Sequence, residues 1–149
     1  MHYLSYGPED GVPVIMIHGN FSSCRFYEHL MPLAPAGFRI LLPDMRIFGN
    51  SERKAVDARR GLRDWSDDTY ALVKALGIKV PVHLAGWSTG GGTIARYAVE
   101  HPGEVASLTF IATVSPYGFG GSHLDGTPCF SDWAGSGGGL SNKRMLRLV

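Results

Sequence analysis

The sequence predicts an α/β fold in which a mostly parallel sheet is flanked by helices. Apolar runs of strand length alternate with stretches of helical period along most of the chain. The runs are nearly continuous, which is typical of parallel strands that are buried on both faces. With 149 residues, 44% of them hydrophobic and 18% charged, the chain has the size and composition of about one globular domain.

Four strands are predicted along the chain, at 12–18, 38–44, 80–87 and 105–112. The opening HYLSYG is a candidate edge strand. A segment of helical length separates most neighbouring runs, so the connections have the form of crossovers between parallel strands.

Three helices are expected between these strands. The first covers 22–34, opens with serines suited to capping, and has apolar residues at helical spacing. These are Phe26, Leu30 and Leu33. The second covers 61–77, and Gly77 stands where a left-handed cap belongs. Its periodic residues are Leu62, Trp65, Thr69, Leu72, Val73 and Leu76. The third is predicted over 89–100, ending before Pro102.

The last third of the sequence has a different composition. Residues 115–149 are rich in Gly, Ser, Pro and aromatic residues, and only their last eight have a helical pattern. We therefore expect a core domain at 1–114 and the beginning of a lid or cap at 115–149. The aromatic residues of this segment suit either a pocket roof or a small separate core. They are Tyr117, Phe119, Phe130 and Trp133.

The stretch GWSTG, residues 86–90, joins the end of a predicted strand to the start of a predicted helix. This is the strand, turn and helix context that a GxSxG nucleophile elbow requires. Glycines on both sides leave room for a tight turn around Ser88. The helix N-terminus offers free N–H groups to a developing oxyanion, and the amide of Thr89 is the candidate donor.

Two further stretches follow predicted strands: HGNF at 18–21 and DMRIFGNS at 44–51. With the elbow, they resemble the α/β-hydrolase superfamily, specifically its esterase, lactonase and cofactor-free haloperoxidase-like branch. The resemblance implies that Ser88 is the nucleophile and that the amides of Asn20 and Thr89 form the oxyanion hole. It implies no metal and no organic cofactor.

The side chains near the elbow have two interpretations each. Trp87 and Phe21 are candidate pocket residues, although Trp87 also suits a packed core position. The position of His18 within HGN predicts a loop-shaping residue rather than a base. The HGN stretch is also similar to that of haloalkane dehalogenases, but those enzymes use an aspartate where this chain has Ser88. Acyl transfer is therefore favoured over alkyl transfer.

The resemblance also indicates what this sequence lacks. In the family, the catalytic acid and histidine follow the serine, on loops after the last two strands of an eight-stranded sheet. HYLSYG matches the family's second strand and 105–112 its sixth, so the chain is expected to cover little more than half of the family's domain. Of the later histidines, only His123 is placed where it could fold over Ser88, and nothing in the sequence holds it within reach.

The turn at 44–51 departs from the family pattern, which has glycine where this sequence has Ile47. A positive φ at that position is costly for a β-branched residue. The sequence therefore predicts either a rearranged turn or relaxed selection on it. Asp44 and Arg46, in the same stretch, are expected to brace loops.

Charge and cysteine content bound the partners and the location. The net charge is +1 with scattered basic residues, so neither nucleic acid nor an anionic membrane is an expected partner. No signal or membrane-length apolar run is present, and Cys24 and Cys129 read as free thiols without metal-ligand spacing. A cytoplasmic location is the expectation.

Three functional hypotheses follow from these patterns. The first is the amino-terminal part of a serine hydrolase that acts on small-molecule carboxylic esters, with acid and histidine supplied by other sequence. The second is a half-domain that forms a homodimer or binds a partner through the exposed edge of strand 105–112. The third is a degenerate hydrolase without activity.

Overall fold

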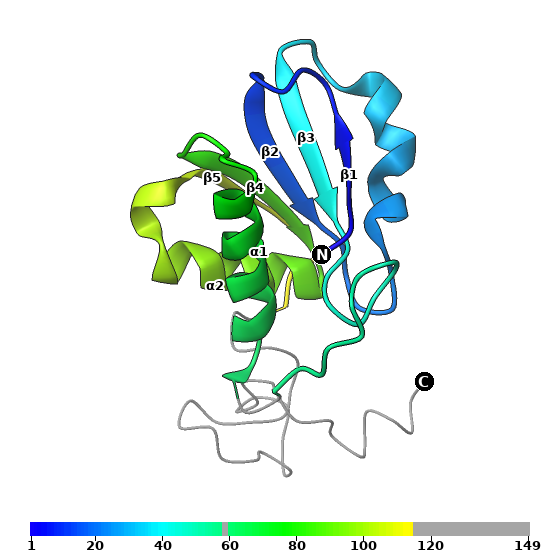
Figure 1. Cartoon of the computed structure of the whole chain (residues 1–149), viewed down its shortest axis with the longest axis vertical. Coiled ribbons are helices and arrows are strands. Elements are labelled where there is room, and N and C mark those ends of the chain that lie inside the picture. Colours follow the sequence, from blue (N-terminus) through cyan, green and yellow to red (C-terminus); the bar gives the residue numbers. More distant parts are fainter. Residues whose placement is uncertain (58–59, 115–149) are drawn as a thin grey trace.

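The computed structural model of the chain describes residues 1–57 and 60–114. They form a five-stranded sheet in the order β1-β3-β2-β4-β5 (Figure 1). The strands are β1 (Tyr3–Tyr6), β2 (Val12–Ile17), β3 (Phe38–Pro43), β4 (Val82–Trp87) and β5 (Val105–Ile111). Only β1 is antiparallel to its neighbour, and the other three pairs are parallel. The predicted mostly parallel α/β sheet is confirmed, with HYLSYG as its edge strand.

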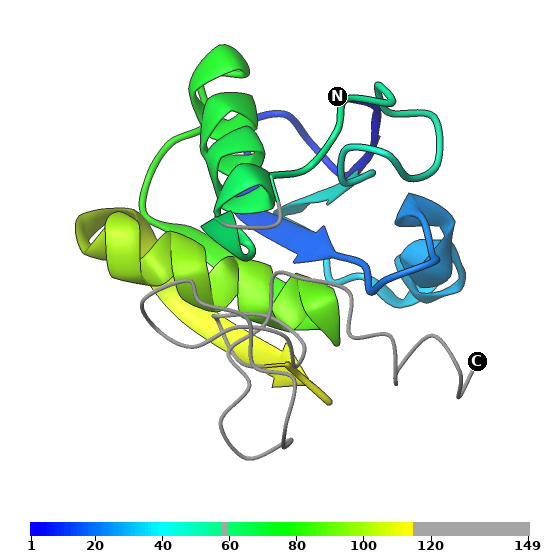
Figure 2. The same ribbon diagram turned by 90° about the horizontal axis from the view of Figure 1, so that it is seen from below.

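Helices lie on both sides of the sheet (Figure 2). Successive side chains of the central strands point to opposite faces of the sheet, so each face has its own apolar cluster for a helix to cover. Ile15 and Ile17 of β2 pack with α1 (Arg63–Ala75) and α2 (Thr89–Glu100). Val14 and Met16 face the 3₁₀ helix η1 (Cys24–Leu33) instead. A short 3₁₀ turn, η3 (Pro102–Glu104), leads from α2 into β5. The result is a three-layer core whose centre is β2 and β4.

The two α-helices agree closely with the sequence prediction. α2 has the predicted bounds and ends two residues before Pro102. α1 is shorter than the predicted 61–77, and Gly77 follows it with φ 58°, which is the expected left-handed cap. Within the described ranges, no helix is long and apolar enough to cross a membrane.

The predicted apolar face of segment 22–34 is wrong. Phe26, Leu30 and Leu33 are exposed, whereas the buried residues of η1 are Cys24, Tyr27 and Met31. Polar contacts select this other face: the Tyr27 hydroxyl donates to the carbonyl of Ile17 at 3.1 Å, and the Cys24 amide donates to a carboxylate at the end of β3. The spacing of apolar residues gives no information about such hydrogen bonds to other elements.

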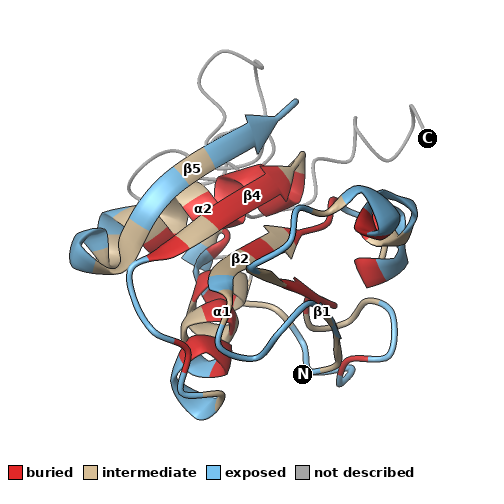
Figure 3. Ribbon diagram, turned by 90° about the horizontal axis from the view of Figure 1, so that it is seen from above, coloured by how far each residue is buried: buried red, intermediate tan, exposed pale blue. Residues whose placement is uncertain are grey.

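Strand β5 has the exposed edge that the sequence analysis expects, but its apolar run is not buried on both faces. Within the described residues β5 is the sheet edge, and most of its residues are exposed (Figure 3). Phe110 and Ile111 retain 47% and 39% of their accessible surface. The predicted lid at 115–149 and its terminal helix lie outside the described residues.

The turn after β3 holds Ile47 in a backbone conformation that favours glycine. Ile47 has φ 69°, so it occupies the left-handed region. Its N–H donates to the carbonyl of Glu52 at 2.9 Å, and its own carbonyl accepts from Arg53 at 2.6 Å. Ile47 therefore adopts the positive φ that the sequence analysis considered, and a non-glycine residue in this region costs about 1–2 kcal/mol.

We expect Ile47→Gly to be more stable than Ile47→Ala by about 1 kcal/mol, because both variants lose the side chain and only glycine removes the left-handed strain. Urea unfolding of the two variants and of the unchanged chain measures this difference. An alanine variant as stable as the glycine variant would show that the backbone at Ile47 is not strained.

Candidate active site

Ser88 occupies the junction between the central strand β4 and the first turn of α2. Its backbone has φ 53° and ψ −116°, outside the regions that serine ordinarily adopts. Hydrogen bonds hold it there: its N–H donates to Ile111 O at 3.0 Å, and its carbonyl accepts from the amides of Gly91 and Val114 at 3.0 and 3.1 Å. The side chain is half-buried. The strained strand-turn-helix elbow predicted from GWSTG is therefore present.

Two glycines of the elbow are required by close backbone contacts. A Cβ on Gly86 would lie 2.4 Å from the carbonyl oxygen of Gly90. A Cβ on Gly90 would lie 2.2 Å from the carbonyl oxygen of Ile17, at the end of β2. Any side chain at either position would have to move backbone atoms, so the glycines allow the first turn of α2 to lie against the ends of β4 and β2.

The HGNF loop after β2 lies directly against the elbow. A Cβ on Gly19 would be 2.7 Å from the Trp87 ring and 3.1 Å from Cβ of Ser88. Asn20, the next residue, is exposed, and Thr89 is the first residue of α2, where amides have no partner within the helix. The structure thus brings the regions of the two candidate oxyanion donors together around Ser88.

His18 shapes this loop, as the sequence analysis predicts. Its Nε2 accepts a hydrogen bond from the Met45 amide at 3.0 Å, so the proton must be on Nδ1, which lies 2.7 Å from the carbonyl oxygen of Gly19. Burial lowers the pKa of His18, despite the hydrogen bond to Gly19. A neutral imidazole with both nitrogens engaged is a structural bridge from β3 to the loop.

The two candidate pocket residues have different environments. Trp87 packs against the core on the η1 side and stacks on Phe26 with ring centroids 4.3 Å apart and planes 5° apart. Phe21 is 86% exposed, with φ 51° and an edge contact to Phe48 at 6.5 Å. Trp87 is therefore first a packed residue, and Phe21 is the one that lies at the surface beside the HGN loop.

No histidine of the described residues is hydrogen-bonded to Ser88. His2 bonds to Asp44, His83 to Ser107, and His101 stacks on Tyr70 with centroids 3.9 Å apart. His29 is exposed on η1. The remaining candidate base, His123, lies outside the described residues.

Asp44 and Arg46 brace loops, as predicted. The Asp44 carboxylate accepts from the amides of Cys24 at 2.6 Å and Asn50 at 2.9 Å, and lies 2.7 Å from Nδ1 of His2. The Arg46 guanidinium donates to both carboxylate oxygens of Asp68 on α1. These contacts tie the turn at 44–51 to the loop after β2 and to α1.

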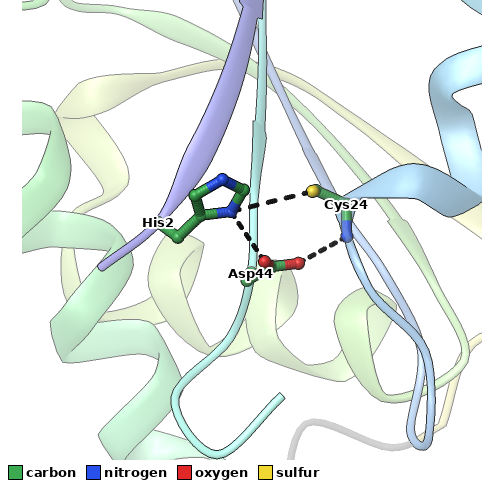
Figure 4. Close-up of side chains that lie close together, drawn as sticks. All are labelled: His2, Cys24 and Asp44. Atoms are coloured by element: carbon green, nitrogen blue, oxygen red, sulfur yellow. Dashed lines mark hydrogen bonds and ion pairs between the residues drawn. The ribbon is translucent and has the colours of Figure 1, made fainter. Parts of the chain in front are cut away.

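One cluster has no signal in the sequence: His2, Cys24 and Asp44, whose donor atoms lie within 4.8 Å of one another (Figure 4). They come from the segment before β1, the start of η1 and the end of β3. Such separate positions match no metal-ligand spacing, and only the sheet order β1-β3-β2 brings them together.

Comparison with known proteins identifies the family. The sequence profile described as alpha/beta hydrolase fold matches residues 12–132. Among curated relatives, a non-heme chloroperoxidase of Streptomyces lividans is 33% identical over 116 residues, which are 76% of this chain and 41% of that protein. A bifunctional esterase/perhydrolase of Acinetobacter calcoaceticus is 34% identical over 117 residues, again 76% and 41%. The chain therefore belongs to the α/β-hydrolase fold family.

Solved structures agree with this assignment. A hypothetical protein from Pseudomonas aeruginosa PAO1 superposes with a TM-score of 0.70 at 29% identity, covering 83% of this chain and 42% of that one. A thermophilic esterase from Thermogutta terrifontis gives 0.63 at 26% identity, covering 76% and 40%. The matched residues span about two fifths of the length of these relatives.

The pH dependence of stability should report on Asp44. Burial alone would raise the pKa of Asp44, but the hydrogen bonds from Cys24, Asn50 and His2 outweigh burial and lower it below its ordinary value of 3.8. Because the pKa of Asp44 is lower in the folded chain than in the unfolded chain, the ionised carboxylate stabilises the fold. This stabilisation is complete above the pKa of the unfolded chain, about 3.9, and is lost as the pH falls through the pKa of the folded chain.

We therefore expect Asp44→Asn to be less stable than the unchanged chain by about 1–3 kcal/mol at pH 7. The asparagine side chain has one acceptor oxygen instead of two, so at least one buried N–H that now donates to Asp44 would lose its acceptor. The difference should shrink as the pH falls below 4. Urea unfolding at a series of pH values, with a chelator present, measures it, and Asp10→Asn at an exposed site is the control. A difference that stays constant down to pH 3 would contradict this role of Asp44.

Proposed function

We propose that this chain supplies the nucleophile and the oxyanion hole of a serine hydrolase that acts on carboxylic esters. The observation that carries the proposal is Ser88, half-buried on a strained elbow with the HGN loop packed against it. Such a turn holds a side chain at the end of the sheet, where a substrate carbonyl can reach it. A packing role alone would not need the strained backbone of Ser88 or the close approach of two loops.

The proposed chemistry has two steps. Oγ of Ser88 attacks the ester carbonyl carbon while its proton passes to a base, and the tetrahedral oxyanion accepts hydrogen bonds from the amides of Asn20 and Thr89. Collapse expels the alcohol, which takes up the proton, and leaves an acyl-serine. Water then attacks the acyl group with the same base, releasing the acid and restoring the Ser88 hydroxyl.

The oxyanion hole is the part of this chemistry that the described residues support best. Thr89 is at the N-terminus of α2, a helix of 12 residues, where backbone N–H groups and the helix dipole favour negative charge. One such donor is typically worth a factor of about 10²–10³ in turnover. The donor from Asn20 belongs to another strand end, so substrate oxygen would be held from two sides.

The base and its acid partner are proposed to come from sequence beyond the described residues. An unassisted serine hydroxyl is almost wholly protonated at neutral pH and is a weak nucleophile. His2, His18 and His83 are engaged elsewhere, as described above. One candidate for the base is His123. The other candidate is a histidine in the part of the fold that the relatives have and that this chain does not match.

The same acyl-serine is compatible with perhydrolysis. Hydrogen peroxide in place of water would release a peracid and restore Ser88 without any change at the elbow. The name of the Acinetobacter relative joins esterase and perhydrolase activities. We therefore propose carboxylic esters as the acyl donors and leave the acceptor, water or peroxide, to measurement.

The decisive experiment is labelling of the purified chain with a fluorophosphonate, followed by mass spectrometry of the adduct. If a base within the chain activates the serine, we expect one adduct per chain, located at Ser88 and absent from Ser88→Ala. Ser107→Ala is the matched control, because Ser107 is also near a histidine but lies on β5.

A second arm supplies the missing elements. We expect a chimera, in which the unmatched carboxyl-terminal part of the Streptomyces lividans relative follows this chain, to hydrolyse a small activated ester and to lose that activity with Ser88→Ala. A folded chimera that is neither labelled nor active would contradict the proposal. Labelling of the chimera but not of the chain would place the base outside these 149 residues.

The alternative is a non-catalytic half-domain that forms a homodimer through β5. The exposed, apolar β5 edge favours it, because unpaired edge strands invite pairing. Light scattering after gel filtration tests it: a dimer that becomes a monomer on Thr109→Pro would support pairing through β5, while a monomeric unchanged chain would exclude it.

A further inference from the structure

Three side chains of different chemistry lie close together: His2, Cys24 and Asp44 (Figure 4). Nδ1 of His2 lies 2.7 Å from a carboxylate oxygen of Asp44 and 3.9 Å from Sγ of Cys24. Asp44 and Cys24 are almost fully buried, at 1% and 2% exposure, while the His2 side chain is 33% exposed. One imidazole, one thiol and one carboxylate thus converge on a point that is open to solvent on the His2 side.

The arrangement is not that of a catalytic triad. In a nucleophile, histidine and acid relay, the acid holds one ring nitrogen and the nucleophile is next to the other. Here Cys24 and Asp44 both approach the same nitrogen, Nδ1 of His2. Burial raises the pKa of the Cys24 thiol to about 12, so this thiol is not an activated nucleophile either.

Convergence of three donors on one point is instead the geometry of metal coordination. From the radii of tetrahedral zinc sites, donor atoms on one ion are about 3.3–3.6 Å apart. All three donors lie within 4.8 Å of one another. The His2–Asp44 separation of 2.7 Å is that of a hydrogen bond and would have to widen when an ion replaces the proton, while the His2–Cys24 separation of 3.9 Å would have to shorten slightly.

We propose that His2, Cys24 and Asp44 form a binding site for a divalent transition metal of the Zn²⁺ or Co²⁺ class. Thiolate and imidazole favour such ions over Mg²⁺ and Ca²⁺, which prefer oxygen ligands. Three protein ligands leave a fourth position for water, on the exposed side of His2. The amides of Cys24 and Asn50, which donate to the Asp44 carboxylate, would orient this ligand from behind.

Binding has a simple proton balance. The metal takes the Nδ1 lone pair of His2 once the ring proton is on Nε2, and Asp44 binds as the carboxylate. Cys24 binds as the thiolate. If the site starts with a neutral imidazole, a carboxylate and a thiol, each ion bound therefore releases one proton, from Sγ of Cys24. No oxidant or reductant takes part.

A metal here would join three segments that the sequence keeps apart. They are the residues before β1, the start of η1 and the end of β3. Cys24 lies three residues after Phe21, the end of the HGNF stretch, so an ion at this site would hold the far end of the loop that carries Asn20. The proposed role is structural support of that loop, which does not depend on whether Ser88 is catalytic.

The test is titration of the tag-free, chelator-treated, reduced 149-residue chain with Co²⁺, read as the thiolate-to-metal absorption band. We expect one ion per chain. Cys24→Ser should abolish the band, and His2→Gln, which keeps an N–H donor for Asp44, should weaken binding by more than the 10–100-fold that outer partners of metal ligands contribute. Zn²⁺ should displace Co²⁺ and raise the melting temperature of the unchanged chain, but not that of the Cys24 and His2 variants.

Matched controls separate this site from other donors. Cys129→Ser removes the other thiol, and His29→Gln removes an exposed imidazole on η1; both should keep the band. Circular dichroism checks that each variant is folded, and Cys24→Ala replaces Cys24→Ser if the latter does not fold. Absence of the band from the unchanged chain, its persistence in the Cys24 variants, or its loss with Cys129→Ser would each overturn the proposal.

Discussion

The close contact between the ends of β2 and β4 is the constraint on which the candidate site depends. A Cβ on Gly90 would lie 2.2 Å from the Ile17 carbonyl oxygen, and one on Gly19 would touch the Trp87 ring at 2.7 Å. A side chain at Gly90 would push the first turn of α2 away from the end of β2, and one at Gly19 would push the HGN loop away from Trp87 and Ser88. Apolar burial builds the sheet, but the absence of two side chains sets the distance between its functional loops.

Hydrogen bonds from neighbouring elements offset the strain that this contact creates. Ser88 and Ile47 both have positive φ, each costing of order 1–3 kcal/mol in isolation. The Ser88 backbone is held by the segment that follows β5, and the turn that contains Ile47 by Asp44 and by its own cross-turn bonds. The elbow at Ser88 therefore depends on contacts with segments before and after it in the chain.

Sequence patterns predicted those features that depend on residues close together in the chain. The strands, the bounds of α2, the cap at Gly77 and the strained elbow all follow from runs, periods and glycine positions. The buried face of η1 did not, because the bond from the Tyr27 hydroxyl to β2 selects it. The exposure of β5 depends on which strand lies beyond it, and the meeting of His2 with Cys24 depends on sheet order. Single-sequence patterns contain neither.

The described residues contain some of the groups that the proposed chemistry needs, but not the base. Nucleophile and oxyanion donors come from the ends of β2 and β4, whereas no described histidine is positioned to take the Ser88 proton. In serine hydrolases, binding and the oxyanion hole alone retain roughly 10³–10⁴-fold acceleration over water when the triad is broken. Charge stabilisation and proton transfer are thus separable functions, and in this family they lie in successive parts of the chain. The function proposed for this chain is the first of them, supported by the backbone geometry at Ser88, and full turnover would require the second.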